Sequence, residues 1–168
     1  MKKKIIGNGD IASVLPEQDE LLFFASGVSN SRETNEKEYE REIDLLFCQD
    51  RESHLVYFGS LSIFYADTRY TTHKKLMETI VKENFRRYTI IRLGNIAWGN
   101  NPNTIINSFR NQVKKGEELD IRDEYRYIVE KEEFLHWINL IPEWSCEMNI
   151  TGQFLTIKEI VDNYVKST

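Results

Sequence analysis

The chain has 168 residues, 40% of them apolar and 29% charged, the composition of a globular protein long enough to bury a core without disulfide or metal staples. Its 22 basic residues against 27 acidic ones give a formal charge of −5, which argues against general binding to nucleic acids. Two cysteines, no metal-ligand spacing, no signal-peptide segment and no run of about 18 apolar residues predict a cytoplasmic protein with neither a metal nor a membrane span.

Short apolar segments alternate with helical segments along the first two thirds of the chain. The apolar segments, which are typical of strands buried on both faces, are residues 4–6, 21–25, 55–58 and 89–91. A brief helix is expected over 10–15, and amphipathic helices are expected over 35–48, 72–87 and 103–115. The alternation predicts an α/β fold in which helices flank a parallel sheet.

Individual side chains in these helices carry further expectations. In the helix over 72–87, the spacing places Leu76 on the inward face with Ile80 and Val81. The charged run from Arg32 to Glu42 reads as the solvated face of one helix. His73 has no metal partner at ligand spacing, so we expect it to be exposed.

The last third of the chain follows a different pattern of predicted elements. A strand is expected over 125–129 and a helix over 132–140, which ends near Pro142. Thr156 and Glu159 form a capping box that starts a final helix. There is no internal repeat and no linker, so we expect one domain over 1–168, with a core at 1–116 and a small α+β extension at 117–168.

The first motif that could carry chemistry follows the first strand. Residues 7–12, Gly-Asn-Gly-Asp-Ile-Ala, match the pattern G-x-G-x-x-G/A. Glycines there let the backbone approach a pyrophosphate, and the helix start behind them offers free N–H groups. A plain glycine turn explains the same residues, so the motif alone leaves both interpretations open.

The second motif is a tyrosine and a lysine four residues apart. Tyr70 and Lys74 share one face at the start of a helix. An ammonium beside a phenol favours the phenolate, which suits the tyrosine to acid–base chemistry. Ser60 lies at the carboxyl end of a central strand, where ligands of α/β sheets bind. Ser62 is an alternative to Ser60, because the end of this strand is fixed only to within a residue or two.

With these motifs the sequence resembles the short-chain dehydrogenase/reductase superfamily, in particular its extended NAD-dependent epimerase/dehydratase branch, which acts on nucleotide sugars. The likeness covers most of the chain, and the tail at 126–129 and 148–150 also fits. The stretches that carry it most clearly are residues 5–12, 23–27, 55–62, 70–78 and 90–99. Its most specific pieces are the Tyr70–Lys74 spacing and the Arg-Leu-Gly-Asn run at 92–95.

The resemblance implies a role for each matching residue. Tyr70 would be the general acid/base, Lys74 would assist it and hold the nicotinamide ribose, and Ser60 would orient the oxygen of a nucleotide sugar or a related hydroxy or keto compound. The positions that would contact an NAD or NADP cofactor are Gly7, Gly9, Asp10, Ile11, Ala12, Ala25, Gly27, Lys74 and Asn95.

The sequence departs from the family between the first two strands. A βαβ unit needs about 30 residues, but the second expected strand begins near Leu21. The second and third strands of a Rossmann-like sheet are therefore expected to be missing, and with them the usual adenosine–ribose pocket. Asp19 and Glu20 come too early to be the acidic residue that holds this ribose.

Two functions of different class follow from these motifs and this departure. One is an NAD(P)-dependent epimerase or reductase with a Ser/Tyr/Lys constellation, in which a homodimer supplies the missing wall of the pocket. The other is a degenerate relative without full cofactor binding that acts as a binding or assembly subunit.

Overall fold

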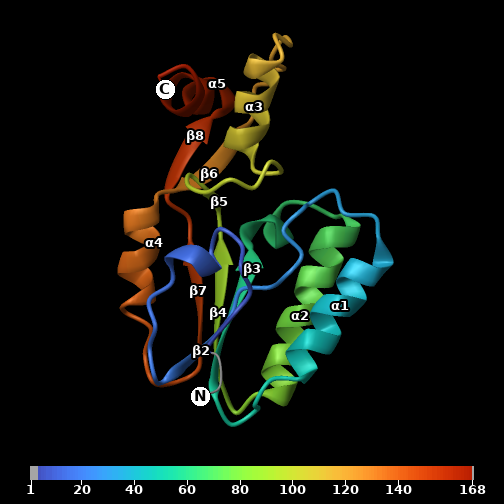
Figure 1. The fold of residues 1–168 in the computed structure, drawn as a ribbon, viewed down its shortest axis with the longest axis vertical. Helices are drawn as coiled ribbons and strands as arrows, with labels where there is room; N and C mark the ends of the chain where they lie inside the picture. The colour runs from blue at the N-terminus through green and yellow to red at the C-terminus, as the bar shows by residue number, and fades with distance from the viewer. Residues whose placement is uncertain (1–3, 168) are drawn as a thin grey trace.

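The computed structural model describes residues 4–167, and its main feature is a five-stranded parallel sheet in the order β1-β2-β3-β4-β7 (Figure 1). This confirms the predicted α/β class. The strands are β1 (Ile5–Ile6), β2 (Leu21–Phe24), β3 (His54–Ser60), β4 (Arg87–Leu93) and β7 (Cys146–Ile150). β1 leads to β2 through residues 7–20, which contain only a single 3₁₀ turn, η1 (Ala12–Val14). No described strand pairs with the outer edge of β1.

Helices cover both faces of this sheet (Figure 1). α1 (Glu36–Phe47) and α2 (Arg69–Asn84) lie on one face, and α4 (Lys131–Ile138) lies with η1 on the other. Successive residues of a strand point to opposite faces, so Leu22 and Phe24 pack toward α1 and α2. Leu21 and Phe23 of the same strand pack into the core under α4. Burial on both faces explains why these strands read as continuous apolar runs.

A second, smaller sheet lies beyond the carboxyl ends of the main strands. Its strands, in the order β5-β6-β8, are β5 (Asn95–Ile96), β6 (Tyr125–Val129) and β8 (Gln153–Thr156). β6 runs parallel to β5 and antiparallel to β8. The helices packed on it are α3 (Ile105–Lys114) and α5 (Ile157–Ile160), which continues as a π-helical turn (Val161–Val165). The chain returns between β6 and β8 to place β7 beside β4 in the main sheet.

Capping residues fix where the helices begin. The Thr68 side chain accepts from the backbone of Thr71, and the Thr71 hydroxyl accepts from the backbone N–H of Thr68, so α2 starts at Arg69, three residues before the predicted start. Tyr70 therefore lies in the first turn of this helix. The predicted capping box of Thr156 and Glu159 is confirmed at the start of α5.

Three expectations about exposure are wrong. Leu76, expected to face inward, is 47% exposed, whereas His73, expected to be exposed, is fully buried. Both errors have one cause, because the buried face of α2 is turned toward the stripe of His73, Lys74, Met77 and Val81. The third is Glu42, which belongs to the run expected to be solvated and is also fully buried. None of the described helices combines the length and apolar character needed to cross a membrane.

Candidate functional site

A cleft of about 980 Å³ opens at the carboxyl ends of the main strands, between them and the small sheet. This is the edge at which ligands of parallel α/β sheets bind. Most of the residues singled out from the sequence line it together: Gly9, Asp10, Ile11, Ala25, Gly27, Ser60, Tyr70, Lys74 and Asn95. Gly7 and Ala12 do not line it; Ala12 is buried in η1.

The two glycines of the first motif have different surroundings. Gly7 has φ +123°, and a Cβ there would lie 2.3 Å from the carbonyl oxygen of Ala25, so only glycine fits against the end of β2. Gly9 faces open space, with no atom within 4 Å of the place a Cβ would take. Gly7 thus shapes the turn, and Gly9 leaves room at the cleft for a ligand group.

Asp10 ties this turn to a distant loop. Its carboxylate accepts hydrogen bonds from the backbone N–H groups of Asn100, at 3.0 Å, and Asn101, at 2.8 Å. Its backbone carbonyl accepts from the indole of Trp98 at 3.0 Å. Asp10 therefore fixes the position of the segment that follows β5 and forms part of the cleft wall.

The two candidate serines lie side by side. Ser60 ends β3 and caps the 3₁₀ turn η2 (Leu61–Phe64) by accepting from the backbone N–H of Ser62. Their hydroxyl oxygens are 2.7 Å apart, and both residues line the cleft. Either hydroxyl could meet a substrate oxygen, so both alternatives remain open.

Tyr70 and Lys74 share one face of α2, as their spacing predicts. Tyr70 is half-buried, whereas Lys74 is 2% exposed. The Lys74 Nζ lies over the Tyr70 ring, 5.5 Å from its centroid, within the range of a cation–π contact. The structure thus places the ammonium beneath the tyrosine ring, in the floor of the cleft.

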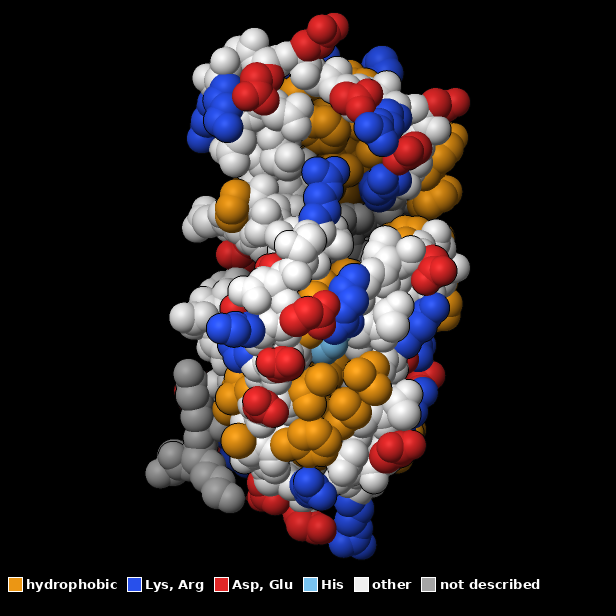
Figure 2. Space-filling model, turned by 90° about the vertical axis from the view of Figure 1, so that its right-hand side faces the viewer, with side chains coloured by type: hydrophobic (Ala, Val, Ile, Leu, Met, Phe, Trp, Pro, Cys, Tyr) orange, Lys and Arg blue, Asp and Glu red, His pale blue; other side chains and the backbone are white. Residues whose placement is uncertain are grey.

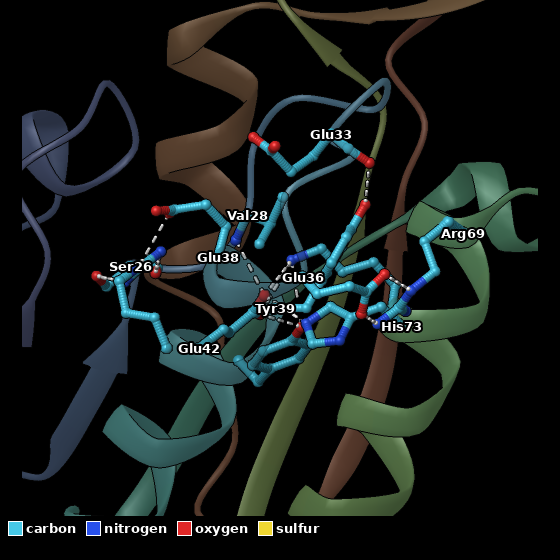
Figure 3. A network of polar contacts seen from close by, with 12 residues as sticks. Ser26, Val28, Glu33, Glu36, Glu38, Tyr39, Glu42, Arg69 and His73 are labelled. Atoms are coloured by element: carbon cyan, nitrogen blue, oxygen red, sulfur yellow. Dashed lines mark hydrogen bonds and ion pairs between the residues drawn. The ribbon is translucent and has the colours of Figure 1, made fainter.

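The Lys74 ammonium donates its hydrogen bonds to other side chains of the protein. Nζ donates to both carboxylate oxygens of Glu42, at 3.1 and 3.4 Å, and to the hydroxyl of Tyr57 at 3.3 Å. Glu42 lies on α1 and is fully buried beside His73 of α2 (Figure 3). It accepts three further bonds, from the His73 imidazole at 2.7 Å, the Tyr57 hydroxyl at 2.8 Å and the backbone N–H of Val28 at 3.0 Å.

Charge and burial act against one another in this network. Burial disfavours ionisation of Glu42, but the Lys74 ammonium and the hydrogen bonds from His73 and Val28 outweigh it and lower the pKa of Glu42 well below its usual range. Burial acts to lower the pKa of Lys74, but the Glu42 carboxylate, together with Tyr70 and Tyr39, outweighs it, so the pKa is raised. Both groups are therefore charged near neutral pH.

Glu42 is the site residue that the sequence interpretation missed. It lies three residues after Tyr39 and four before Leu46, both of which are buried on the inward face of α1. A glutamate on the apolar stripe of a helix needs a buried cation or donors to satisfy it. That spacing was the available signal, and the charged residues around it in the run 32–42 obscured it.

Cationic side chains outnumber carboxylates in the lining of the cleft, but three of the four are paired with carboxylates that lie outside that lining. Among the described residues that line it, four side chains are cationic (Arg32, Arg41, Lys74 and Arg126), against the single carboxylate of Asp10. The Arg41 guanidinium is held at the rim by the carbonyl and hydroxyl oxygens of Ser26, at 3.0 and 3.2 Å. Arg41 also pairs with Glu38 at 3.2 Å, and Arg126 pairs with Glu124 at 2.7 Å. A guanidinium has five N–H donors, so these arginines keep donors that suit an anionic ligand such as a phosphate.

The fold matches those of solved enzymes at low sequence identity. WbmG of Bordetella bronchiseptica in complex with NAD gives a TM-score of 0.55 at 19% identity, over 66% of this chain and 43% of WbmG. The dTDP-4-dehydrorhamnose reductase of Bacillus anthracis in complex with NADP gives 0.54 at 17%, over 66% of this chain and 47% of the reductase. The UDP-N-acetylglucosamine 4-epimerase of Methanobrevibacter ruminantium, in complex with UDP-N-acetylmuramic acid, gives a TM-score of 0.56 at 15% identity. The match covers 92% of this chain and 62% of the epimerase.

These likenesses concern the fold alone. The matched part is less than half the length of WbmG and of the reductase. No protein-family model matches the sequence, and no curated protein sequence matches it significantly. Five parallel strands, flanking helices and a small mixed sheet nevertheless agree with the resemblance carried by the motifs. The chain therefore has the fold of the NAD-dependent epimerases, dehydratases and reductases of the extended short-chain dehydrogenase/reductase type.

Proposed function

We propose that this protein is an NAD(P)-dependent epimerase or reductase that acts on a nucleotide sugar or a related hydroxy or keto compound. The observation that carries the proposal is the composition of the cleft, where Ser60, Tyr70, Lys74 and the glycine turn meet. The guanidinium donors that line the cleft suit the diphosphate that dinucleotide cofactors and nucleotide sugars share. Solved enzymes of the same fold hold NAD, NADP or a uridine diphosphate sugar.

The residues of the cleft fit the nicotinamide half of such a cofactor. Open space at Gly9 leaves room for a pyrophosphate, and Tyr70 and Asn95 line the region beyond the carboxyl ends of β3 and β4. The adenosine half has less support, because no described strand lies beyond β1 and the β1–β2 connection holds only one short turn. We propose that this part of the sheet is truncated and that the adenosine–ribose pocket is rebuilt from other segments.

When bound, a nicotinamide ring gives or takes a hydride at a substrate carbon. The residues of the chain supply the accompanying proton transfer. In reduction the Tyr70 hydroxyl donates its proton to the substrate carbonyl oxygen, and in oxidation the Tyr70 phenolate takes the proton of the substrate hydroxyl. The Ser60–Ser62 pair orients that oxygen. The Lys74 ammonium lies under the tyrosine ring, and the guanidinium groups of the cleft arginines supply donors for the phosphates.

Titration of the purified protein with NADH and NADPH by calorimetry tests the proposal. Saturable binding at one site per chain, weakened by Arg41→Met at the cleft rim but not by Arg51→Met in the exposed turn between α1 and β3, is the expected result. The absence of binding at millimolar cofactor would contradict an NAD(P)-dependent reaction. A substrate screen with nucleotide sugars follows a positive result.

One observation favours a second function. The Lys74 N–H groups already bond within the protein, whereas the enzyme hypothesis asks this residue to hold a nicotinamide ribose. A chain that keeps the cleft without a free lysine could bind a nucleotide sugar as a non-catalytic subunit. Binding of UDP without binding of NADH in the same calorimetric assay would favour this alternative.

We also propose that a second copy of the chain covers the outer face of α1 and α2. Hydrophobic side chains gather on this face (Figure 2), where Phe47 of α1 is 41% exposed and Leu76 of α2 is 47% exposed. Apolar residues in a contiguous exposed patch mark interaction surfaces.

A further inference from the structure

We propose that Glu42 is a positioning residue for Lys74: from α1, it holds the ammonium in the floor of the cleft and cancels its charge. Its importance for a reaction rests on the proposed function, but its effect on Lys74 can be measured without any cofactor or substrate. No motif in the sequence marks Glu42, and it does not line the cleft itself but contacts Lys74, Val28 and Gly27, which do.

The first step of the argument is the geometry of the pair. Glu42 is 0% exposed and Lys74 2% exposed, and their Nζ–Oε1 separation is 3.1 Å. A carboxylate and an ammonium buried this deeply are stable only together, because either one alone would be an uncompensated charge away from water. The two side chains join α1 to α2 directly beneath Tyr70.

The second step is the hydrogen bond of His73. Its Nε2 lies 2.7 Å from the Glu42 carboxylate, which can only accept, so Nε2 carries a proton. Its Nδ1 is buried and has no hydrogen-bond partner among the described residues. The Glu42 carboxylate therefore meets the His73 imidazole on one oxygen and the Lys74 ammonium on the other.

The third step is the close packing at Gly27. A Cβ at this residue would lie 2.7 Å from Glu42 Oε1 and 2.8 Å from Lys74 Nζ. The backbone of the β2–α1 loop thus rests on the ion pair from the cleft side. Glycine at this position lets the loop close over the pair and keeps the ammonium turned toward Glu42 and Tyr57.

The titratable groups around Lys74 come from three elements. They are Glu42 and Tyr39 on α1, Tyr57 on β3, and on α2 itself Tyr70, His73 and Glu78, of which Glu78 is paired with Arg92. Glu42 is the one carboxylate of this set that bonds the ammonium. Its removal should therefore change the protonation of Lys74 more than any other single substitution.

Labelling of Lys74 in the intact protein tests the proposal. Trace acetic anhydride modifies neutral amines, and mass spectrometry of the Lys74 peptide gives the pH profile of its reactivity. In Glu42→Gln this profile should move to lower pH by about one unit or more, because burial then acts on an ammonium without its counter-charge. Glu40→Gln makes the same charge change on the exposed side of α1 and should leave the profile unchanged.

A profile of folded Glu42→Gln that coincides with that of Glu40→Gln would overturn the proposal. If Glu42→Gln does not fold, the double variant Glu42→Gln/Lys74→Met decides, because it removes both charges at similar volume. Recovery of the cooperative thermal transition in the double variant supports a pair that acts as a unit. No recovery means that Glu42 acts through Val28 and His73 instead, which also overturns the proposal.

The outcome is separable from that of the proposed function. A shifted Lys74 profile together with no NADH binding would retain the role of Glu42 and reject the NAD(P)-dependent reaction. NADH binding with an unshifted profile would do the opposite.

Discussion

Removal of the Tyr70 hydroxyl should impair catalysis without disturbing the fold. Tyr70→Phe should lower turnover at least about 100-fold, because a positioned general acid or base contributes about 10²–10⁴ to a rate. Tyr65→Phe removes a hydroxyl from the same cleft and should leave turnover within a few-fold of the wild-type value. Steady-state assays of both variants, with thermal unfolding as a check on folding, make the comparison. Equal activity of the two variants would remove Tyr70 from the mechanism.

The two glycines of the first turn allow a second test at the residue scale. Gly7→Ala should lower the free energy of unfolding by more than about 1 kcal/mol, because its φ of +123° and the Ala25 carbonyl leave no place for a methyl group. Gly9→Ala, which meets nothing within 4 Å, should change it by less than about 0.5 kcal/mol. Urea unfolding measures the free energy of unfolding of both variants. A similar loss in the two would contradict the assignment of Gly7 to the turn and of Gly9 to the ligand space.

Gly9→Ala should still weaken NADH binding, because its methyl group takes space in the cleft. Gly7→Ala serves as the comparison, since its effect lies in the turn rather than in the ligand space. Calorimetry at a temperature where both variants are folded separates the two effects.

At the scale of elements, the Glu42–Lys74 pair joins α1 to α2 and makes this packing depend on pH. The pKa of Glu42 is lower in the folded protein than in the unfolded chain, so the unfolded chain binds more protons as the pH falls. The stabilisation is complete above the unfolded pKa, about 4.3, and is lost as the pH falls below it toward the folded value. We expect the free energy of unfolding to decline below about pH 4.3, and more steeply for the wild type than for Glu42→Gln.

Urea titrations at several pH values between 3 and 7 measure this dependence. Glu40→Gln is the matched control, because Glu40 is exposed on the same helix, and it should keep the wild-type slope. If the free energy of unfolding falls with pH equally steeply for the wild type and for Glu42→Gln, the Glu42 carboxylate has the same pKa in the folded and unfolded states. That result would contradict the lowered pKa.

Elements with a strong local pattern could be predicted closely. The sequence placed β2, β3 and β4 within a few residues of their observed bounds, because strands buried on both faces are continuous apolar runs. β6 was also placed at its observed bounds. β7 was not predicted as a strand, because its sequence Cys-Glu-Met-Asn-Ile alternates polar and apolar residues. β5 and β8 were not predicted, since each is short and is held mainly by its partner β6. The start of α2 was placed three residues late because its threonine cap lacks the acidic third residue of the usual capping box.

For the whole molecule, the exposed hydrophobic face of α1 and α2 predicts self-association. Leu76→Asp should shift the protein from dimer to monomer, because it places a charge in the apolar patch (Figure 2). Val113→Asp is the control, as Val113 is 49% exposed on α3, away from this face. Sedimentation velocity at micromolar concentration measures both. A wild-type protein that sediments as a monomer would reject the dimer.

The sequence by itself determined the α/β class, the order of the elements over the first two thirds of the chain and most of the candidate residues that line the cleft. It could do so because apolar periodicity and glycine positions are local, and because the ends of parallel strands meet at one edge. The tertiary structure alone decided the partners of the charged groups. Glu42 and Lys74 are 32 positions apart, and no pattern within either helix states that they meet. Burial and charge pairing depend on how α1 packs on α2, so the floor of the cleft became visible only in the folded protein.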